Sequence, residues 1–301
     1  MNTATLDEEE RRSRRRSLLG ALALTLAILV LEVAGGLLSH SLALLADAAH
    51  MFADIAALLL AYAGMTLACR APTGRHTFGL YRAEILAAFV NAQILLLLAV
   101  YVGYEAVRRF ENPVDVHTRA MFWIAALAVG GNFVAMRLLS RGTASSLNLR
   151  AAYLEVLTDM LSSLAVLAAA VAIPLTGWQW LDAAVSAGVA LFILPRAVSI
   201  LRQSAHILLE GAPGDIDLPL VRERLLRLPG VEQLHDLHFW TLTSGLHSAS
   251  VHIRASGDRP REEVLAAVQE LLREHAGVDH ATVQLEWGSE MSCHASSRGH
   301  A

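Results

Sequence analysis

Residues 41–62 read SLALLADAAHMFADIAALLLAY, and this stretch decides the fold because it places ionisable side chains in a segment long and apolar enough to cross a bilayer. His50 and Asp54 are four residues apart, so on a helix they project from one face, about 5–6 Å apart at Cβ. An aspartate at the centre of a membrane helix costs about 2.5–3.5 kcal/mol on the insertion scale. The stretch therefore predicts a membrane helix that carries a functional site.

A second stretch repeats this pattern. Residues 151–172 read AAYLEVLTDMLSSLAVLAAAVA and place Glu155 and Asp159 at the same spacing. Together the two stretches offer four nitrogen and oxygen donors, which suit a tetrahedral zinc-type ion. The alternative is a set of interhelical hydrogen bonds or a proton relay without metal. We expect a metal site formed by His50, Asp54, Glu155 and Asp159.

Asp47 precedes His50 by three residues and so lies near the same helix face. We expect it to orient His50 from outside the ligand set, as carboxylates do in many metal sites. A direct ligand and a charge near the helix end are the alternatives.

The composition of the chain supports a membrane protein. Hydrophobic residues make up 54% of it and charged residues only 17%, against about 25% charged in a typical soluble domain. Apolar stretches of spanning length fall at 18–39, 43–67, 84–107, 120–139, 152–173 and 180–201. We therefore predict a transmembrane domain of six helices over residues 17–205, preceded by a basic segment over residues 1–16.

Arginines set the predicted orientation. Most of them fall before the first span, after the even-numbered spans, or beyond, whereas only three lie in loops on the other side: Arg108, Arg109 and Arg119. By the positive-inside rule we expect both termini in the cytoplasm. We also expect a multi-pass protein of a bacterial-type inner (plasma) membrane.

The remainder is predicted to form a small cytoplasmic α+β domain over residues 212–288. A helix begins after Asp217, and two strands over 232–242 and 246–255 form a hairpin. A second helix ends at Gly277 and a last strand covers 281–286, which gives an α-β-β-α-β order. Residues 289–301 are polar and are predicted to form a disordered tail.

Histidines in this domain indicate a second metal site. His235 and His252 are expected to face each other across the hairpin, with Glu286 arriving from the last strand. Side chains alternate along a strand, so Asp236 is expected to point away from His235. His76, between the second and third spans, is a candidate for a surface metal site. In each case exposed histidines without a role are the alternative.

Several functions are excluded by missing motifs. The chain has no H-E-x-x-H, no nucleophile elbow and no Walker loop, so neither hydrolysis nor ATP-driven transport has candidate residues. No basic patch indicates nucleic-acid binding. We expect no enzymatic activity and no organic cofactor, and an ion gradient, with protons as the counter-ion, as the driving force.

Five segments resemble the cation diffusion facilitator family: SLALLADAAHMFAD (41–54), TFGLYRAEILAAFVNA (77–92), SSLNLRAAYLEVLTDMLSS (145–163), LLEGAP (208–213) and HDLHFWTLTSG (235–245). The resemblance covers residues 17–288 and is strongest to the branch of bacterial cobalt–zinc–cadmium resistance exporters. It implies a homodimer with six spans per protomer, a ferredoxin- or metallochaperone-like cytoplasmic domain that binds metal, and exchange of metal for protons by alternating access. It also implies that His50, Asp54, Glu155 and Asp159 are the transport ligands.

Glu155 stands where zinc-selective members of the family commonly carry histidine. The harder oxygen donor predicts looser selectivity among zinc, cobalt and cadmium. Three ionised carboxylates close together repel one another, so we expect at least one to hold a proton until metal binds. Our hypothesis is that His50 and Glu155 exchange protons. A metal sensor or scaffold that moves no metal is the alternative function, and an exporter of organic cations is disfavoured because aromatic residues make up only 6% of the chain.

Overall fold

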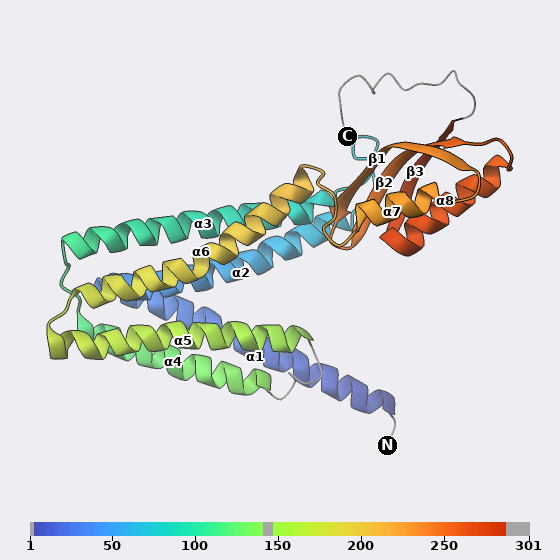
Figure 1. Ribbon diagram of the computed structural model, residues 1–301. Coiled ribbons are helices and arrows are strands. Elements are labelled where there is room, and N and C mark those ends of the chain that lie inside the picture. Colours follow the sequence, from blue (N-terminus) through green and yellow to red (C-terminus); the bar gives the residue numbers. More distant parts are fainter. Residues whose placement is uncertain (1–2, 141–146, 287–301) are drawn as a thin grey trace. The chain divides into compact units, whose positions relative to one another are not determined.

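The computed structural model describes residues 3–140 and 147–286, which form eight helices and three strands (Figure 1). In chain order they are α1 (Thr3–Ser39), α2 (Leu42–Ala68), α3 (Arg82–Glu111), α4 (Thr118–Ser140), α5 (Leu147–Thr176), α6 (Trp180–Leu208), α7 (Leu218–Leu226), β1 (Val231–Thr243), β2 (Leu246–Ala255), α8 (Arg261–Ala276) and β3 (Val278–Glu286). The predicted tail over residues 289–301 lies outside the described residues.

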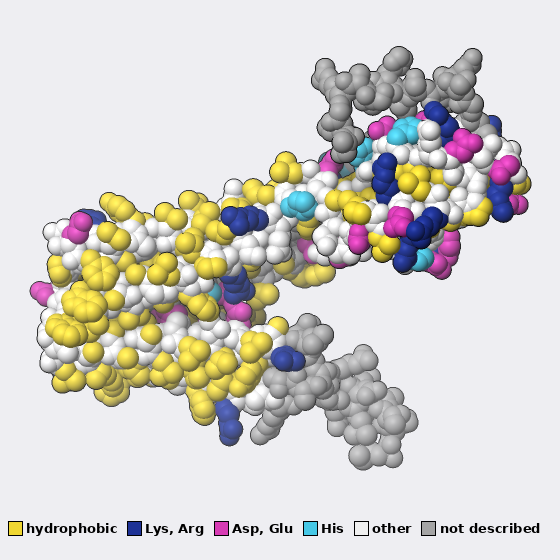
Figure 2. Space-filling view, viewed as in Figure 1, with side chains coloured by type: hydrophobic (Ala, Val, Ile, Leu, Met, Phe, Trp, Pro, Cys, Tyr) yellow, Lys and Arg dark blue, Asp and Glu magenta, His cyan; other side chains and the backbone are white. Residues whose placement is uncertain are grey.

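Helices α1–α6 each contain a segment long and apolar enough to cross a membrane, from 22 residues in α1 to 30 in α3. The six spans predicted from the sequence are therefore confirmed. Large apolar side chains also cover the outer surface of these helices (Figure 2), and Leu97, Tyr101 and Phe192 are each more than 60% exposed. Such a surface is unusual for a soluble protein and is expected of one that faces lipid.

The chain divides into two compact units. The first comprises residues 1–59 and 90–200, which hold most of the six long helices. Its core is rich in alanine: Ala46 and Ala53 of α2 pack with Ala99 of α3 and Ala190 of α6. Small side chains allow the backbones of membrane helices to approach closely.

One glycine shows how tight this packing is. A Cβ atom built on Gly35 of α1 would lie 2.2 Å from Cδ1 of Ile124 in α4, so a larger residue could not occupy this position without a shift of the side chain. Helix α1 packs against α4, and α4 packs against α5.

The second unit comprises residues 60–89 and 201–301. It holds the ends of α2, α3 and α6 together with the C-terminal domain, whose α-β-β-α-β order agrees with the prediction. The strands lie in the order β1-β2-β3, with β1 antiparallel to β2 and β2 parallel to β3. Helices α7 and α8 contact each other and cover one face of this sheet (Figure 1).

Local signals in the sequence explain the boundaries of the C-terminal domain. The Asp217 carboxylate accepts a hydrogen bond from the Leu220 amide at 3.1 Å and caps α7. Gly245, with φ of +75°, makes the turn between the paired residues Thr243 and Leu246. Gly277 ends α8 in the left-handed conformation. Strand β3 begins at Val278, three residues earlier than predicted.

Candidate metal centres

Three predicted ligands meet in the first unit. His50 and Asp54 come from α2 and Asp159 from α5, and one ligand atom of each lies within 4.8 Å of the other two. His50 Nδ1 is 3.6 Å from Asp54 Oδ2. A tetrahedral zinc ion with bonds of about 2.1 Å separates its ligands by about 3.4 Å, so a small contraction would close these three residues around an ion. We call them the transport triad, after the role that the sequence leads us to expect of them.

Four polar atoms of the transport triad are buried and have no hydrogen-bond partner among the described residues. His50 is 3% exposed and Asp159 is 4% exposed. The four atoms are both ring nitrogens of His50, Oδ2 of Asp54 and Oδ1 of Asp159. Buried polar atoms are almost always hydrogen-bonded, so a cluster of unpartnered donors and acceptors is an unusual feature. Imidazole nitrogen and carboxylate oxygen are common ligands of divalent transition-metal ions.

Glu155, the fourth predicted ligand, lies outside this group of three, although its carboxyl group contacts that of Asp54. Its Oε1 atom accepts a hydrogen bond from Arg196 Nη1 of α6 at 2.9 Å. The same guanidinium nitrogen lies 3.9 Å from Oδ1 of Asp54. From the sequence, Arg196 contributed only to the predicted orientation of the helices in the membrane. Arg196 lies within α6, and its guanidinium group reaches Asp54 of the transport triad as well as Glu155.

Asp47 contacts serines rather than His50. Its carboxylate accepts hydrogen bonds from the hydroxyl groups of Ser162 and Ser163 on α5, the latter at 2.9 Å. Glu32 of α1 is completely buried and lies within electrostatic range of Asp47. Glu32 was not among the residues predicted from the sequence, although a lone acidic residue in an apolar span is itself a signal of function.

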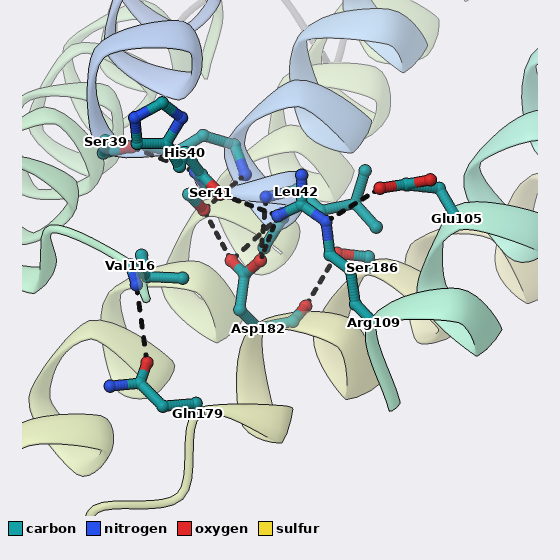
Figure 3. Close-up of polar contacts among 12 residues, drawn as sticks. Ser39, His40, Ser41, Leu42, Glu105, Arg109, Val116, Gln179, Asp182 and Ser186 are labelled. Atoms are coloured by element: carbon teal, nitrogen blue, oxygen red, sulfur yellow. Dashed lines mark hydrogen bonds and ion pairs between the residues drawn. The ribbon is translucent and has the colours of Figure 1, made fainter. Parts of the chain in front are cut away.

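Another buried carboxylate in the first unit, that of Asp182, is well supplied with hydrogen bonds. Asp182, near the start of α6, accepts from the Ser41 hydroxyl at 2.6 Å and from the Leu42 and Ala43 amides at 2.8 and 3.2 Å (Figure 3). Nη1 of Arg109 lies 3.5 Å from the same carboxylate. Asp182 therefore caps the N-terminus of α2, which links α6 to α2 and α3.

The predicted cytoplasmic ligands also come together. His235 and His252 are paired across the hairpin, with ring centroids 5.4 Å apart. Oε1 of Glu286 lies 3.3 Å from Nε2 of His235 and 3.7 Å from Nδ1 of His252. Glu286 is 1% exposed, and no partner among the described residues reaches its Oε2 atom. This unpartnered buried oxygen fits a metal ligand.

The expected orientation of Asp236 was wrong. A β-bulge lies between His235 and His238, and Asp236 has φ of +48°. The extra residue interrupts the alternation of side chains, so Oδ2 of Asp236 lies 3.7 Å from Nδ1 of His252. His76 belongs to no group of three ligand-type residues in the described part of the chain.

Comparison with known families identifies the chain. Its residues 18–209 match the cation efflux transmembrane domain, and residues 213–287 match the cytoplasmic domain of cation efflux proteins. The chain belongs to the cation efflux family. This finding confirms the resemblance to cation diffusion facilitators.

Several cation efflux proteins align over most of this chain. The metal cation efflux system protein CzcD of Cupriavidus metallidurans is 44% identical over 90% of the chain and 86% of its own length. The cadmium, cobalt and zinc/H(+)-K(+) antiporter of Bacillus subtilis is 37% identical over 91% of the chain and 89% of its own length. The zinc transporter ZitB of Escherichia coli is 38% identical over 93% of the chain and 88% of its own length.

One solved structure that matches part of this chain is the metal-bound C-terminal domain of the CzcD transporter from Cupriavidus metallidurans. It is 39% identical in sequence and covers 24% of this chain and 99% of its own, with a TM-score of 0.23.

Proposed function

We propose that this cation efflux protein exports divalent metal cations in exchange for protons. The transport triad carries the proposal: His50, Asp54 and Asp159 place unpartnered nitrogen and oxygen atoms inside helices that can cross a membrane. A divalent cation would compensate the buried carboxylates directly. Metal ligands bind in their deprotonated forms, so the entry of metal releases protons from such a site.

Zinc, cobalt and cadmium are the proposed cargo. Relatives are named for transport of these three metals or of zinc alone. One imidazole combined with carboxylates gives a donor set without a strong preference within this group. Replacement of Glu155 by histidine is expected to narrow transport toward zinc.

We also propose a homodimer with both termini in the cytoplasm, in which the C-terminal domain holds resident metal. His235, His252 and Glu286 would bind this metal. Glu286 joins β3 to the hairpin, so a metal ion there would tie the three strands together.

The test is metal flux in liposomes. The purified full-length protein is reconstituted with a metal-sensitive dye inside and an imposed pH gradient. We expect Zn²⁺ uptake that depends on the gradient, and none above background for Asp54→Asn. Asp115→Asn, which removes an exposed carboxylate between α3 and α4, is the matched control and should transport normally.

The same assay separates transport from sensing. A sensor or scaffold would bind Zn²⁺ in equilibrium dialysis and yet give no uptake into the liposomes. That outcome would contradict the proposed function.

A further inference from the structure

Arg196 is a permanent positive charge beside a site built for a positive ion. Its Nη1 atom donates a hydrogen bond to Glu155 at 2.9 Å and lies 3.9 Å from Asp54 of the transport triad. A guanidinium group stays protonated at any physiological pH. Its charge therefore acts on the site whether or not protons are exchanged.

The position of Glu155 makes this contact significant. Glu155 lies one helical turn before Asp159 on α5, so both side chains project from the same helix face. Asp159 belongs to the group of ligand atoms within 4.8 Å of one another, whereas Glu155 does not. Glu155 is thus placed between two partners, because its carboxyl group contacts Asp54 of the transport triad and also pairs with Arg196.

We propose that Arg196 is a tethered counter-cation that holds Glu155 while the transport triad is without metal and yields it to the incoming ion. This inference rests on the proposed transport function. Glu155 then stays ionised and exchanges one cation for another, so its negative charge is balanced in both states. This differs from the hypothesis drawn from the sequence, in which Glu155 exchanges a proton. An unbalanced carboxylate in the membrane would be costly.

Competition from Arg196 lowers the affinity of the site for metal. The entering ion must displace Arg196 from Glu155, and it meets the positive charge of the guanidinium group. During release the same group recaptures Glu155, which favours departure of the ion. A transporter needs binding that is reversible at both faces of the membrane, and Arg196 contributes to it.

The experiment compares Arg196→Gln with wild type in the full-length protein. A partly exposed ion pair contributes up to about 1 kcal/mol, so we expect the Kd for Zn²⁺ to fall about fivefold. KM should fall with it, and kcat should fall as well, because release becomes slower. Arg202→Gln removes the same charge from an exposed position further along α6 and is the matched control, with Kd and kcat unchanged.

A double-mutant cycle shows whether Arg196 acts through Glu155. In a Glu155→Gln background, Arg196→Gln should change the Kd for Zn²⁺ less than it does in wild type, because its partner is already gone. Equal effects in both backgrounds, or an unchanged Kd in the single variant, would overturn the inference. A structural role alone would instead lower stability and weaken binding.

Infrared difference spectra provide a second measurement on the wild-type protein, should Arg196→Gln fail to fold. Addition of Zn²⁺ should shift guanidinium bands, identified by ¹⁵N-arginine labelling, and Glu155→Gln should abolish the shift. Unshifted bands in a wild-type protein that binds and transports Zn²⁺ would contradict the role of Arg196. A wild-type protein that neither binds nor transports metal would instead overturn the proposed function together with this inference.

Discussion

Two acidic sites lie in the same unit of this protein, and they differ in hydrogen bonding: one has several partners and the other has few. The carboxylate of Asp182 accepts hydrogen bonds from the Ser41 hydroxyl and two amides of α2, and Arg109 lies beside it. In the transport triad, both nitrogens of His50 and one oxygen of Asp159 have no partner among the described residues. Burial alone therefore does not distinguish the two sites, whereas hydrogen bonding does.

The comparison assigns different roles to residues of the same type. Asp182 stabilises the junction of three helices, because its charge meets a helix N-terminus and an arginine. Asp159 costs stability in the absence of metal, because no hydrogen bond compensates the burial of its Oδ1 atom. A protein retains such a cost where function requires it.

The largest expected effect is on transport by the Asp159→Asn variant. Loss of a ligand should reduce Zn²⁺ flux more than about 100-fold, since even residues around a metal site change affinity by about 10- to 100-fold. The free energy of unfolding should stay the same or rise, because one of several neighbouring acidic groups loses its charge. Flux in liposomes and thermal unfolding without metal measure the two quantities. A variant that loses stability and keeps transport would show that Asp159 stabilises the fold and does not bind the transported metal.

Asp182→Asn should show the opposite pattern. The substitution leaves the Arg109 charge and the α2 amides poorly compensated, at a cost of about 2–4 kcal/mol in stability. The Kd for Zn²⁺ of the folded fraction should match that of wild type. Unfolding in denaturant and equilibrium dialysis are the measurements. An unchanged unfolding curve together with lost metal binding would show that Asp182 belongs to the transport site.

Metal is expected to stabilise the C-terminal domain through His235 and His252. At a concentration of Zn²⁺ one hundred times the Kd, binding contributes about 2.7 kcal/mol to the folded state. His252→Ala should remove most of this effect and lower the bound Zn²⁺ by one ion per chain. His275→Ala, near the exposed end of α8, is the matched control. Equal stabilisation of both variants would place the metal elsewhere.

The smallest expected effect concerns Asp47. Its hydrogen bonding is intermediate between that of Asp182, which has several partners, and that of Asp159. Ser163→Ala removes one of its two serine hydrogen bonds and should cost about 1 kcal/mol in stability. Zn²⁺ flux should change less than about threefold, because Ser162 still donates to Asp47. Thermal unfolding and flux are again the readouts. A loss of flux as large as that of Asp159→Asn would place Asp47 within the transport site.

Much of the fold could be read from the sequence because its signals are local. Twenty apolar residues specify a membrane helix, and Asp217 and Gly277 mark helix ends by their own backbone chemistry. The spacing of His50 and Asp54 likewise follows from one helical turn. These features need no knowledge of what packs against them.

The remaining features depend on contacts between distant segments. Arg196 reaches Glu155 across 41 positions of sequence, and Asp182 caps a helix that begins 140 positions earlier. Neither pairing leaves a pattern in a single sequence. The bulge at Asp236 is equally hidden, because one extra residue in a strand changes no motif and yet redirects a side chain toward His252.

The location of bound metal tests the central claim most directly. Crystals of the full-length His235→Ala/His252→Ala protein, soaked in Zn²⁺, would be measured at the zinc absorption edge. We predict an anomalous peak between α2 and α5, within bonding distance of His50, Asp54 and Asp159. A protein that takes up zinc and shows no peak at these three residues would contradict the account.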